Sequence, residues 1–226
     1  LGSVRATRAE RAAGATTTAI DDVAQKATDA LLLQRTRVAA KVVGPAAPEE
    51  IAAAQARSVP LGRTWAYSTD DPNVRYEFQW VVSDIDDLIP SHTDAFTENP
   101  LFPKDVQRRL RSRGTMRNQV DKTGRNLAAD YLLTDSHAIN AGSETTFNQI
   151  VESGNNRELG KRLARDIYPE KWAEYKDELV RRVEAGEYGP VSPEELDRIK
   201  AMPNPNLHRE RLTNMDPVRY AEEANT

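Results

Sequence analysis

Apolar and polar residues alternate along residues 74–82, which is the two-residue period of a half-buried strand. The apolar members are Val74, Tyr76, Phe78, Trp80 and Val82. A turn rich in Asp and Pro at residues 68–73 precedes this stretch, and residues 64–68 form a shorter candidate strand. The pattern therefore predicts a β-hairpin near the start of the folded domain.

Helical spacing of apolar residues predicts helices on both sides of this domain. An amphipathic helix is expected over residues 16–43 and an Ala-rich one over residues 49–58, so residues 1–60 form a helical N-terminal arm. A helix over residues 169–185 begins with Pro169, and Ser192 starts another through a capping box. From residue 202 onward we expect an extended tail, so that residues 169–226 form a C-terminal extension.

Shorter elements fill the middle of the chain. Two short helices broken near Gly114 are expected within residues 104–127, and one helical turn over residues 130–133. A strand over residues 145–151 and a helix over residues 155–166 follow. The elements together predict a mixed α+β domain over residues 61–168, flanked by the two helical arms.

The polar turn between this last strand and helix is the most informative local feature. Gly154 permits backbone conformations closed to other residues, and the N–H groups at a helix start attract anions. Arg157 adds a guanidinium group that suits phosphate oxygens. The alternative is that Ser153 or Asn155 simply caps an ordinary helix, and the spacing alone favours this alternative.

Composition limits the function classes. The chain has 226 residues and a net charge of -4, which gives no global case for nucleic-acid binding. It contains no Cys, so disulfides, thiolate nucleophiles and Cys-based zinc sites are excluded. No apolar run is long enough to span a bilayer, and we expect an intracellular protein without a membrane partner. Because the chain begins with Leu1, we expect a fragment or a processed product.

One block of this acidic chain is strongly basic. Its members are Lys104, Arg108, Arg109, Arg111, Arg113, Arg117, Lys122 and Arg125. This density favours contact with DNA phosphates or a nucleotide, and the alternative is a solvated helix face paired with the acidic residues 84–87. The block lacks aromatic residues, so it gives no support for stacking on single-stranded bases. We expect Trp65, Trp80 and Trp172 to pack in a core or an interface.

A metal site is a further hypothesis. Carboxylates and histidines occur near the polar motifs: Asp84, Asp86, Asp87, Glu152, His92 and His137. They permit a metal-dependent nuclease site, although nothing in their spacing selects one. A loop histidine is more often a surface residue that makes hydrogen bonds.

Three short motifs follow one another in the chain. Residues 87–92 read Asp-Leu-Ile-Pro-Ser-His, residues 107–113 read Gln-Arg-Arg-Leu-Arg-Ser-Arg, and residues 151–157 read Val-Glu-Ser-Gly-Asn-Asn-Arg. In this order they resemble the ParB-like superfamily, in particular the DdrB-like ParB domains in polyvalent proteins of phages and other mobile elements. The resemblance covers roughly residues 74–166.

The resemblance implies a small ParB/sulfiredoxin-like fold with a nucleotide between the second and third motifs. The cofactor it implies is a nucleoside triphosphate resembling CTP, with Mg²⁺. The nucleotide- or phosphate-binding residues would be Gln107, Arg109, Arg111, Gly154, Asn155, Asn156 and Arg157. The DNA-binding residues would be Arg108, Arg113, Arg117, Lys122 and Arg125.

Departures from the family pattern favour binding over hydrolysis. Arg108 replaces the family proline, and Asn156 replaces a glycine. No segment after Arg157 reproduces the Glu-Asn-x-x-Arg motif that holds triphosphate and metal in chromosome-partitioning relatives. Sulfiredoxin chemistry is excluded because it requires a cysteine.

The first hypothesis is a nucleotide- or DNA-binding domain of a phage or mobile-element protein. The second is a virion-associated structural protein that uses a degenerate ParB-like fold as an interaction scaffold, and the weakest is a nuclease or nucleoside triphosphatase. Expected partners are DNA, a larger parent polypeptide or phage assembly, and a second copy joined through the helical arms. The expected location is the cytoplasm of an infected or host bacterial cell, or the virion.

Overall fold

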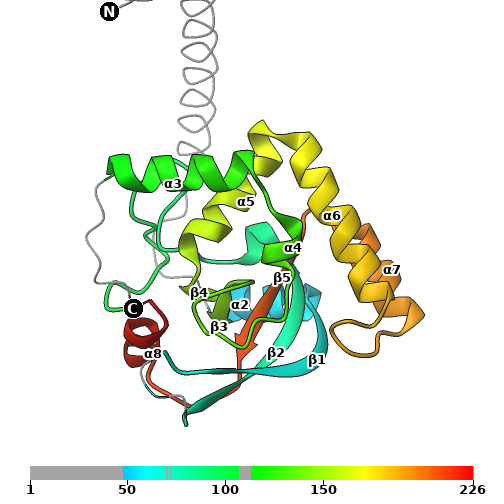
Figure 1. Cartoon of the computed structure of the whole chain (residues 1–226), viewed down its shortest axis with the longest axis horizontal. Helices are drawn as coiled ribbons and strands as arrows, with labels where there is room; N and C mark the ends of the chain where they lie inside the picture. The colour runs from blue at the N-terminus through cyan, green and yellow to red at the C-terminus, as the bar shows by residue number, and fades with distance from the viewer. Residues whose placement is uncertain (1–47, 70, 72, 107–112, 226) are drawn as a thin grey trace, which may run out of the picture. The chain divides into compact units, whose positions relative to one another are not determined.

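The computed structural model describes residues 48–225 except residues 70, 72 and 107–112. Within this part, a five-stranded sheet is combined with seven α-helices (Figure 1). The predicted α+β class is therefore confirmed. The helix predicted over residues 16–43 lies outside the described residues.

The sheet is mixed. Its strands are β1 (Val59–Tyr67), β2 (Arg75–Asp84), β3 (Thr145–Phe147), β4 (Ile150–Ser153) and β5 (Pro205–Arg211). Their spatial order is β1-β2-β5-β3-β4, and β5 and β3 run parallel while the other neighbours are antiparallel. The central strand therefore comes from the last part of the described chain.

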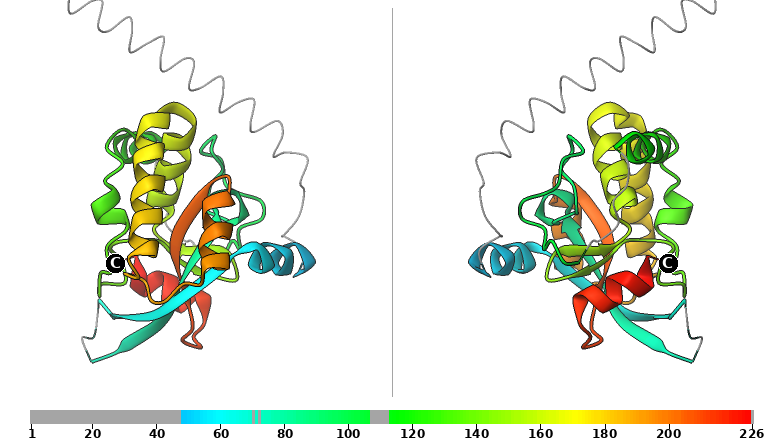
Figure 2. Two further views of the ribbon diagram at one scale, coloured as in Figure 1. Left: turned by 90° about the vertical axis from the view of Figure 1, so that its right-hand side faces the viewer. Right: turned by 90° about the vertical axis from the view of Figure 1, so that its left-hand side faces the viewer.

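The helices are arranged around this sheet (Figure 2). They are α2 (Pro48–Arg57), α3 (Arg113–Arg125), α4 (Ala129–Leu132), α5 (Asn155–Ile167), α6 (Pro169–Glu184), α7 (Pro193–Ala201) and α8 (Pro217–Ala224). Ser192 caps α7 and forms the predicted capping box with Glu195. In Figures 1 and 2, α3 and α8 lie at opposite ends of the domain.

The predicted β1–β2 hairpin is present, and the alternation along β2 explains its packing. The apolar side chains at even positions of β2 are buried, as a two-residue period requires. Trp80 belongs to the same buried cluster as Trp172 and Leu179 of α6, whereas the Phe78 ring contacts Tyr220 of α8. The same face of the hairpin therefore packs against both α6 and α8. β1 is longer than predicted and begins at Val59.

Two predictions for single elements are wrong. Residues 145–151 form a hairpin instead of one strand, because Asn148 and Gln149 both take positive φ angles, 51° and 66°, as in a type I′ turn. The extended tail predicted from residue 202 is instead β5 and α8. The helix break predicted near Gly114 stays a prediction, because α3 begins at Arg113 and residues 107–112 lie outside the described residues.

β5 escaped prediction because its buried residues are largely polar. Asn206, His208, Arg209 and Arg211 are all at most 2% exposed. Each finds hydrogen-bond partners inside the protein, which makes its burial tolerable. Hydropathy alone does not identify such a strand.

Candidate functional site

The turn that joins β4 to α5 is shaped by Gly154. This residue is the N-cap of α5 with φ 89°, and no side chain caps the helix. Its carbonyl accepts hydrogen bonds from the N–H groups of Arg157 and Glu158, at 2.8 and 3.0 Å. A Cβ atom here would lie 2.8 Å from Nη2 of Arg157. Glycine is therefore required both by the left-handed backbone and by the arginine that folds over it.

Ser153 and Asn155, the two caps considered as an alternative, have other roles. The Ser153 hydroxyl donates to the carbonyl of Ala224, at 3.1 Å. The Asn155 side chain accepts from the N–H of Ser91, at 2.7 Å, and donates to the carbonyl of Val151, at 2.9 Å. Asn155 thereby ties the first motif, residues 87–92, to the Gly154 turn.

Arg157 has an incomplete set of hydrogen bonds. Its Nη1 donates to the carbonyl of Asn140, at 2.8 Å. Its Nε and Nη2 atoms are buried and have no hydrogen-bond partner among the residues that the structure describes. These are the atoms that lie closest to Gly154, within about 3 Å of the position a Cβ would take. The turn therefore presents two unsatisfied cationic donors beside a helix N-terminus.

The basic helix α3 lies against the same turn. Nδ2 of Asn156 donates to Oε1 of Gln119 on α3, at 2.7 Å. The two helices approach closely because both carry glycine: a Cβ on Gly160 would lie 2.5 Å from Cγ2 of Thr123, and one on Gly124 would lie 3.1 Å from the carbonyl oxygen of Gly160. The predicted phosphate turn and part of the predicted DNA-binding block are thus neighbours.

Within α3, the described basic residues make local contacts. The Arg117 guanidinium lies 5.4 Å from the Phe96 ring, and Arg125 pairs with Asp121 at 2.9 Å. Lys122 is exposed. Gln107, Arg108, Arg109 and Arg111 lie outside the described residues, and the structure describes only the backbone of Arg113, where α3 begins.

The acidic loop, residues 84–87, is the alternative partner expected for this block, but its carboxylates have other partners. Asp87 accepts two hydrogen bonds from Arg57, at 2.6 and 3.2 Å. Asp86 pairs with Arg165 of α5, at 2.7 Å. Asp84 accepts from the backbone N–H groups of Asp86 and Asn204, at 3.0 and 3.2 Å.

A buried polar network supports α5 from beneath and was not predicted. Lys161 bonds to Glu144 and to Asn206, and Asn206 donates to Glu158 at 3.2 Å. All four side chains are fully buried. Burial raises the pKa of Glu158, against the lowering effects of Arg162 and Lys161. The i, i+3 spacing of Glu158 and Lys161 was the available sequence signal.

The carboxylates and histidines considered for a metal site are dispersed. Among the described residues, no group of three or more His, Asp or Glu side chains could hold a metal ion. Both oxygens of Glu152 accept from Arg211, at 2.8 Å each. His137 stacks on Trp65, with ring centroids 3.9 Å apart.

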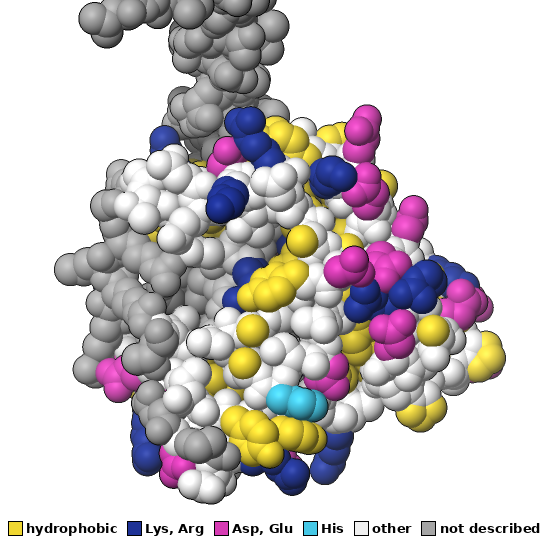
Figure 3. All heavy atoms as spheres, viewed as in Figure 1, with side chains coloured by type: hydrophobic (Ala, Val, Ile, Leu, Met, Phe, Trp, Pro, Cys, Tyr) yellow, Lys and Arg dark blue, Asp and Glu magenta, His cyan; other side chains and the backbone are white. Residues whose placement is uncertain are grey.

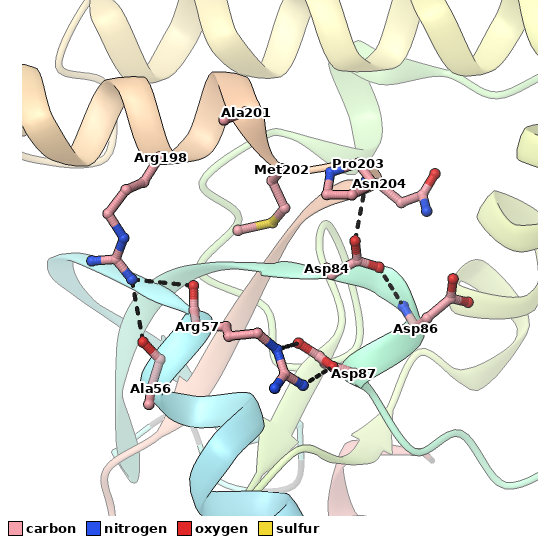
Figure 4. A pocket seen from close by; sticks show the side chains of 10 residues that line it. All are labelled: Ala56, Arg57, Asp84, Asp86, Asp87, Arg198, Ala201, Met202, Pro203 and Asn204. Atoms are coloured by element: carbon pink, nitrogen blue, oxygen red, sulfur yellow. Dashed lines mark hydrogen bonds and ion pairs between the residues drawn. The ribbon is translucent and has the colours of Figure 1, made fainter.

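A separate open pocket of about 730 Å³ lies between the end of α2 and the end of α7 (Figure 4). Its polar lining includes Arg57, Arg198 and the acidic loop. One nitrogen of Arg198, Nη2, donates to the carbonyls of residues 56–58 at the end of α2. Arg57 forms an ion pair with Asp87 across the same pocket (Figure 4). The positive charge of Arg57 is therefore neutralised within the protein.

Comparison with protein families gives one match. The model of the ddrB-like ParB superfamily domain matches residues 71–212. Comparisons with curated proteins and with solved structures found no significant match. No helix in the described part of the chain is long and apolar enough to cross a membrane.

The family match contains all three motifs and extends beyond the predicted limit near residue 166. It reaches residue 212, which includes the central strand β5. The matched segment spans well over half of the chain and coincides with the sheet that positions Gly154 and Arg157. The chain therefore belongs to the family of the ddrB-like ParB superfamily domain.

Proposed function

We propose that the domain binds a nucleoside triphosphate or the phosphates of DNA at the Gly154 turn, and that it binds without hydrolysis. The observation that carries this proposal is the pair of unpartnered, buried donors on Arg157. A buried donor without a partner costs roughly 1–3 kcal/mol, and more when it is charged. A phosphate oxygen at this position would accept from both nitrogens.

The surroundings favour an anion of the size of a polyphosphate. The start of α5 contributes the positive end of its helix dipole. Through the Asn156–Gln119 bond the turn continues into α3, where Lys122 is exposed. Gln107, Arg109 and Arg111 would complete the nucleotide site, and Arg108, Arg113, Arg117 and Arg125 would extend it toward DNA. A bound triphosphate would bring Mg²⁺ with it.

Calorimetric titration tests this proposal. Wild-type protein is titrated with CTP and the other nucleoside triphosphates in the presence of Mg²⁺, and separately with a short DNA duplex. Arg157→Ala is expected to weaken binding roughly 10- to 100-fold, the value of one or two charge-assisted hydrogen bonds. The matched control is Arg181→Ala on α6, where the arginine is 58% exposed and paired with Glu178.

Three outcomes would contradict the proposal. If wild-type protein binds neither ligand saturably, the domain has no such function. If Arg157→Ala and Arg109→Ala both retain full affinity, binding occurs elsewhere on the protein. Release of inorganic phosphate from a bound triphosphate would show that the domain hydrolyses its ligand, which contradicts binding without hydrolysis.

One observation favours the scaffold alternative. The side chains of Asn155 and Asn156 both make hydrogen bonds within the domain, so neither is available to a ligand without rearrangement. Such hydrogen bonds within the domain are expected if its pocket is degenerate and it acts as a scaffold in a larger phage polypeptide or a virion. Absence of any saturable nucleotide or DNA binding is the result that this alternative requires.

A further inference from the structure

The outward face of the β1–β2 hairpin carries a cluster of aromatic and cationic side chains, here called the hairpin platform. Its members are Arg63, Trp65, Tyr67, Arg75 and His137. The three β1 residues share one face because alternate residues of a strand point the same way, and Arg75 stands opposite Tyr67 in the register. Figure 3 shows hydrophobic side chains and a histidine next to one another over this hairpin.

The aromatic rings of the platform are held in place. The His137 imidazole stacks on the Trp65 indole with ring centroids 3.9 Å apart and an interplanar angle of 3°. His137 Nδ1 lies 3.0 Å from the Trp65 carbonyl, and it must be the donor because a carbonyl only accepts. The Tyr67 ring meets Trp65 edge-on at 4.8 Å. A ligand would therefore find a preformed surface with little ordering cost.

Trp65 differs from the other two tryptophans. Trp80 and Trp172 are 1% and 4% exposed, as predicted for core residues. Trp65 is only half-buried, and its neighbour Tyr67 is 44% exposed. Large aromatic rings gathered on a surface mark a binding site more often than chance.

The cations beside the rings indicate the chemistry of the ligand. Arg63 is exposed and makes no ion pair with any residue that the structure describes. The Arg75 guanidinium lies 5.5 Å from the Trp65 ring and pairs with Glu77 at 3.3 Å, where both side chains are about half exposed. Such a surface pair is worth at most about 1 kcal/mol, so a phosphate can replace the carboxylate.

We infer that the hairpin platform binds single-stranded nucleic acid. Unpaired bases would stack on Tyr67 and against the His137–Trp65 stack, while Arg63 and Arg75 would contact the backbone phosphates. A peptide ligand without acidic residues would use the rings but leave Arg63 without a counter-charge among the described residues, since only Arg75 pairs with Glu77. The platform shares no residue with the proposed site at Arg157, but the loop at residues 137–140 connects them: His137 belongs to the platform, and the Asn140 carbonyl accepts from Arg157.

Tryptophan fluorescence tests this inference directly, because Trp65 is the one half-exposed tryptophan among three. Titration with an oligothymidine strand is expected to quench it saturably and less strongly at high salt. With a labelled strand, Trp65→Ala and Tyr67→Ala are each expected to lower affinity about 5- to 100-fold. The control Tyr131→Ala removes a ring that is 49% exposed on α4 and should change nothing.

The variants also separate this inference from the proposed function. Arg157→Ala is expected to keep full oligothymidine affinity, while Trp65→Ala keeps nucleoside triphosphate binding. Lack of saturable oligothymidine binding by wild-type protein overturns the inference. So does a loss of affinity that is the same for Trp65→Ala and Tyr131→Ala, or quenching by a proline-rich peptide in place of the strand. Circular dichroism melting of Tyr67→Ala, whose ring is exposed, confirms that the fold is intact.

Discussion

At the scale of single residues, β5 shows two ways of burying an arginine. Arg211 makes a bidentate pair with Glu152 and lies between the rings of Phe147 and Tyr220. Arg209 instead donates to backbone carbonyls of residues 136–143, and burial lowers its pKa. These guanidinium groups fix the loop and the hairpin that surround the Gly154 turn.

Removing one member of the buried pair is expected to destabilise the fold. Glu152→Ala leaves the Arg211 guanidinium uncompensated in a fully buried position, so the free energy of unfolding should fall by roughly 3–5 kcal/mol. Glu174→Ala, which breaks the exposed pair with Lys171, should cost about 0–1 kcal/mol. Urea denaturation measures both. Equal losses in the two variants would show that the Glu152 pair has no special role.

His208 is expected to make the fold sensitive to acid. It lies 2.8 Å from the Ser83 hydroxyl and 2.7 Å from the Thr146 hydroxyl, and burial, followed by Lys161, lowers its pKa to about 3. In the unfolded chain its pKa is about 6.5, so between these values only the unfolded state binds the proton. Stability should therefore decline as the pH falls through this window, by at most about 1.4 kcal/mol per pH unit.

The contribution of His208 can be isolated by difference. Glu152, Glu158 and Glu210 have pKa values raised chiefly by burial, so their protonation acts in the opposite direction. We therefore compare the pH dependence of the unfolding free energy in wild type and in His208→Gln. The wild-type curve should fall more steeply toward acid. Parallel curves would mean that His208 takes up its proton equally in both states.

At the scale of elements, the crossing of α3 and α5 depends on glycine. Gly160→Ala would place a methyl group 2.5 Å from Cγ2 of Thr123, so we expect a loss of roughly 1–3 kcal/mol from overpacking. Gly114→Ala, on the exposed surface of α3, meets nothing within 4 Å and should stabilise the helix by about 0.5–1 kcal/mol. Thermal denaturation separates the two variants by the sign of the shift.

The sequence predicts elements that carry their own local signals. The β1–β2 alternation and the Ser192 capping box are confirmed because period and capping chemistry are local properties. The hairpin at residues 148 and 149 was missed because neither residue is glycine. For the candidate site, the left-handed turn at Gly154 was predictable because it depends on glycine itself. The hydrogen bond of Asn155 with Ser91 was not predictable, because the two residues lie more than sixty positions apart in the sequence.

At the scale of the whole molecule, the two proposed ligand surfaces are mounted on one sheet. The Gly154 turn follows β4 at one edge of the sheet, and the hairpin platform occupies β1 at the other edge. The central strand β5 joins the two halves by pairing with β2 and β3. The two surfaces share no residue, although the loop that carries His137 also accepts a hydrogen bond from Arg157 at the Asn140 carbonyl.

The position of β5 late in the chain also affects how the protein folds during its synthesis. As the chain leaves the ribosome, both hairpins emerge before residues 205–211 and can form early, since their contacts are local. Until β5 arrives, β2 and β3 each expose an unpaired inner edge that can capture a neighbouring nascent chain. We therefore expect a chain that lacks residues 205–211 to aggregate more readily than the complete chain.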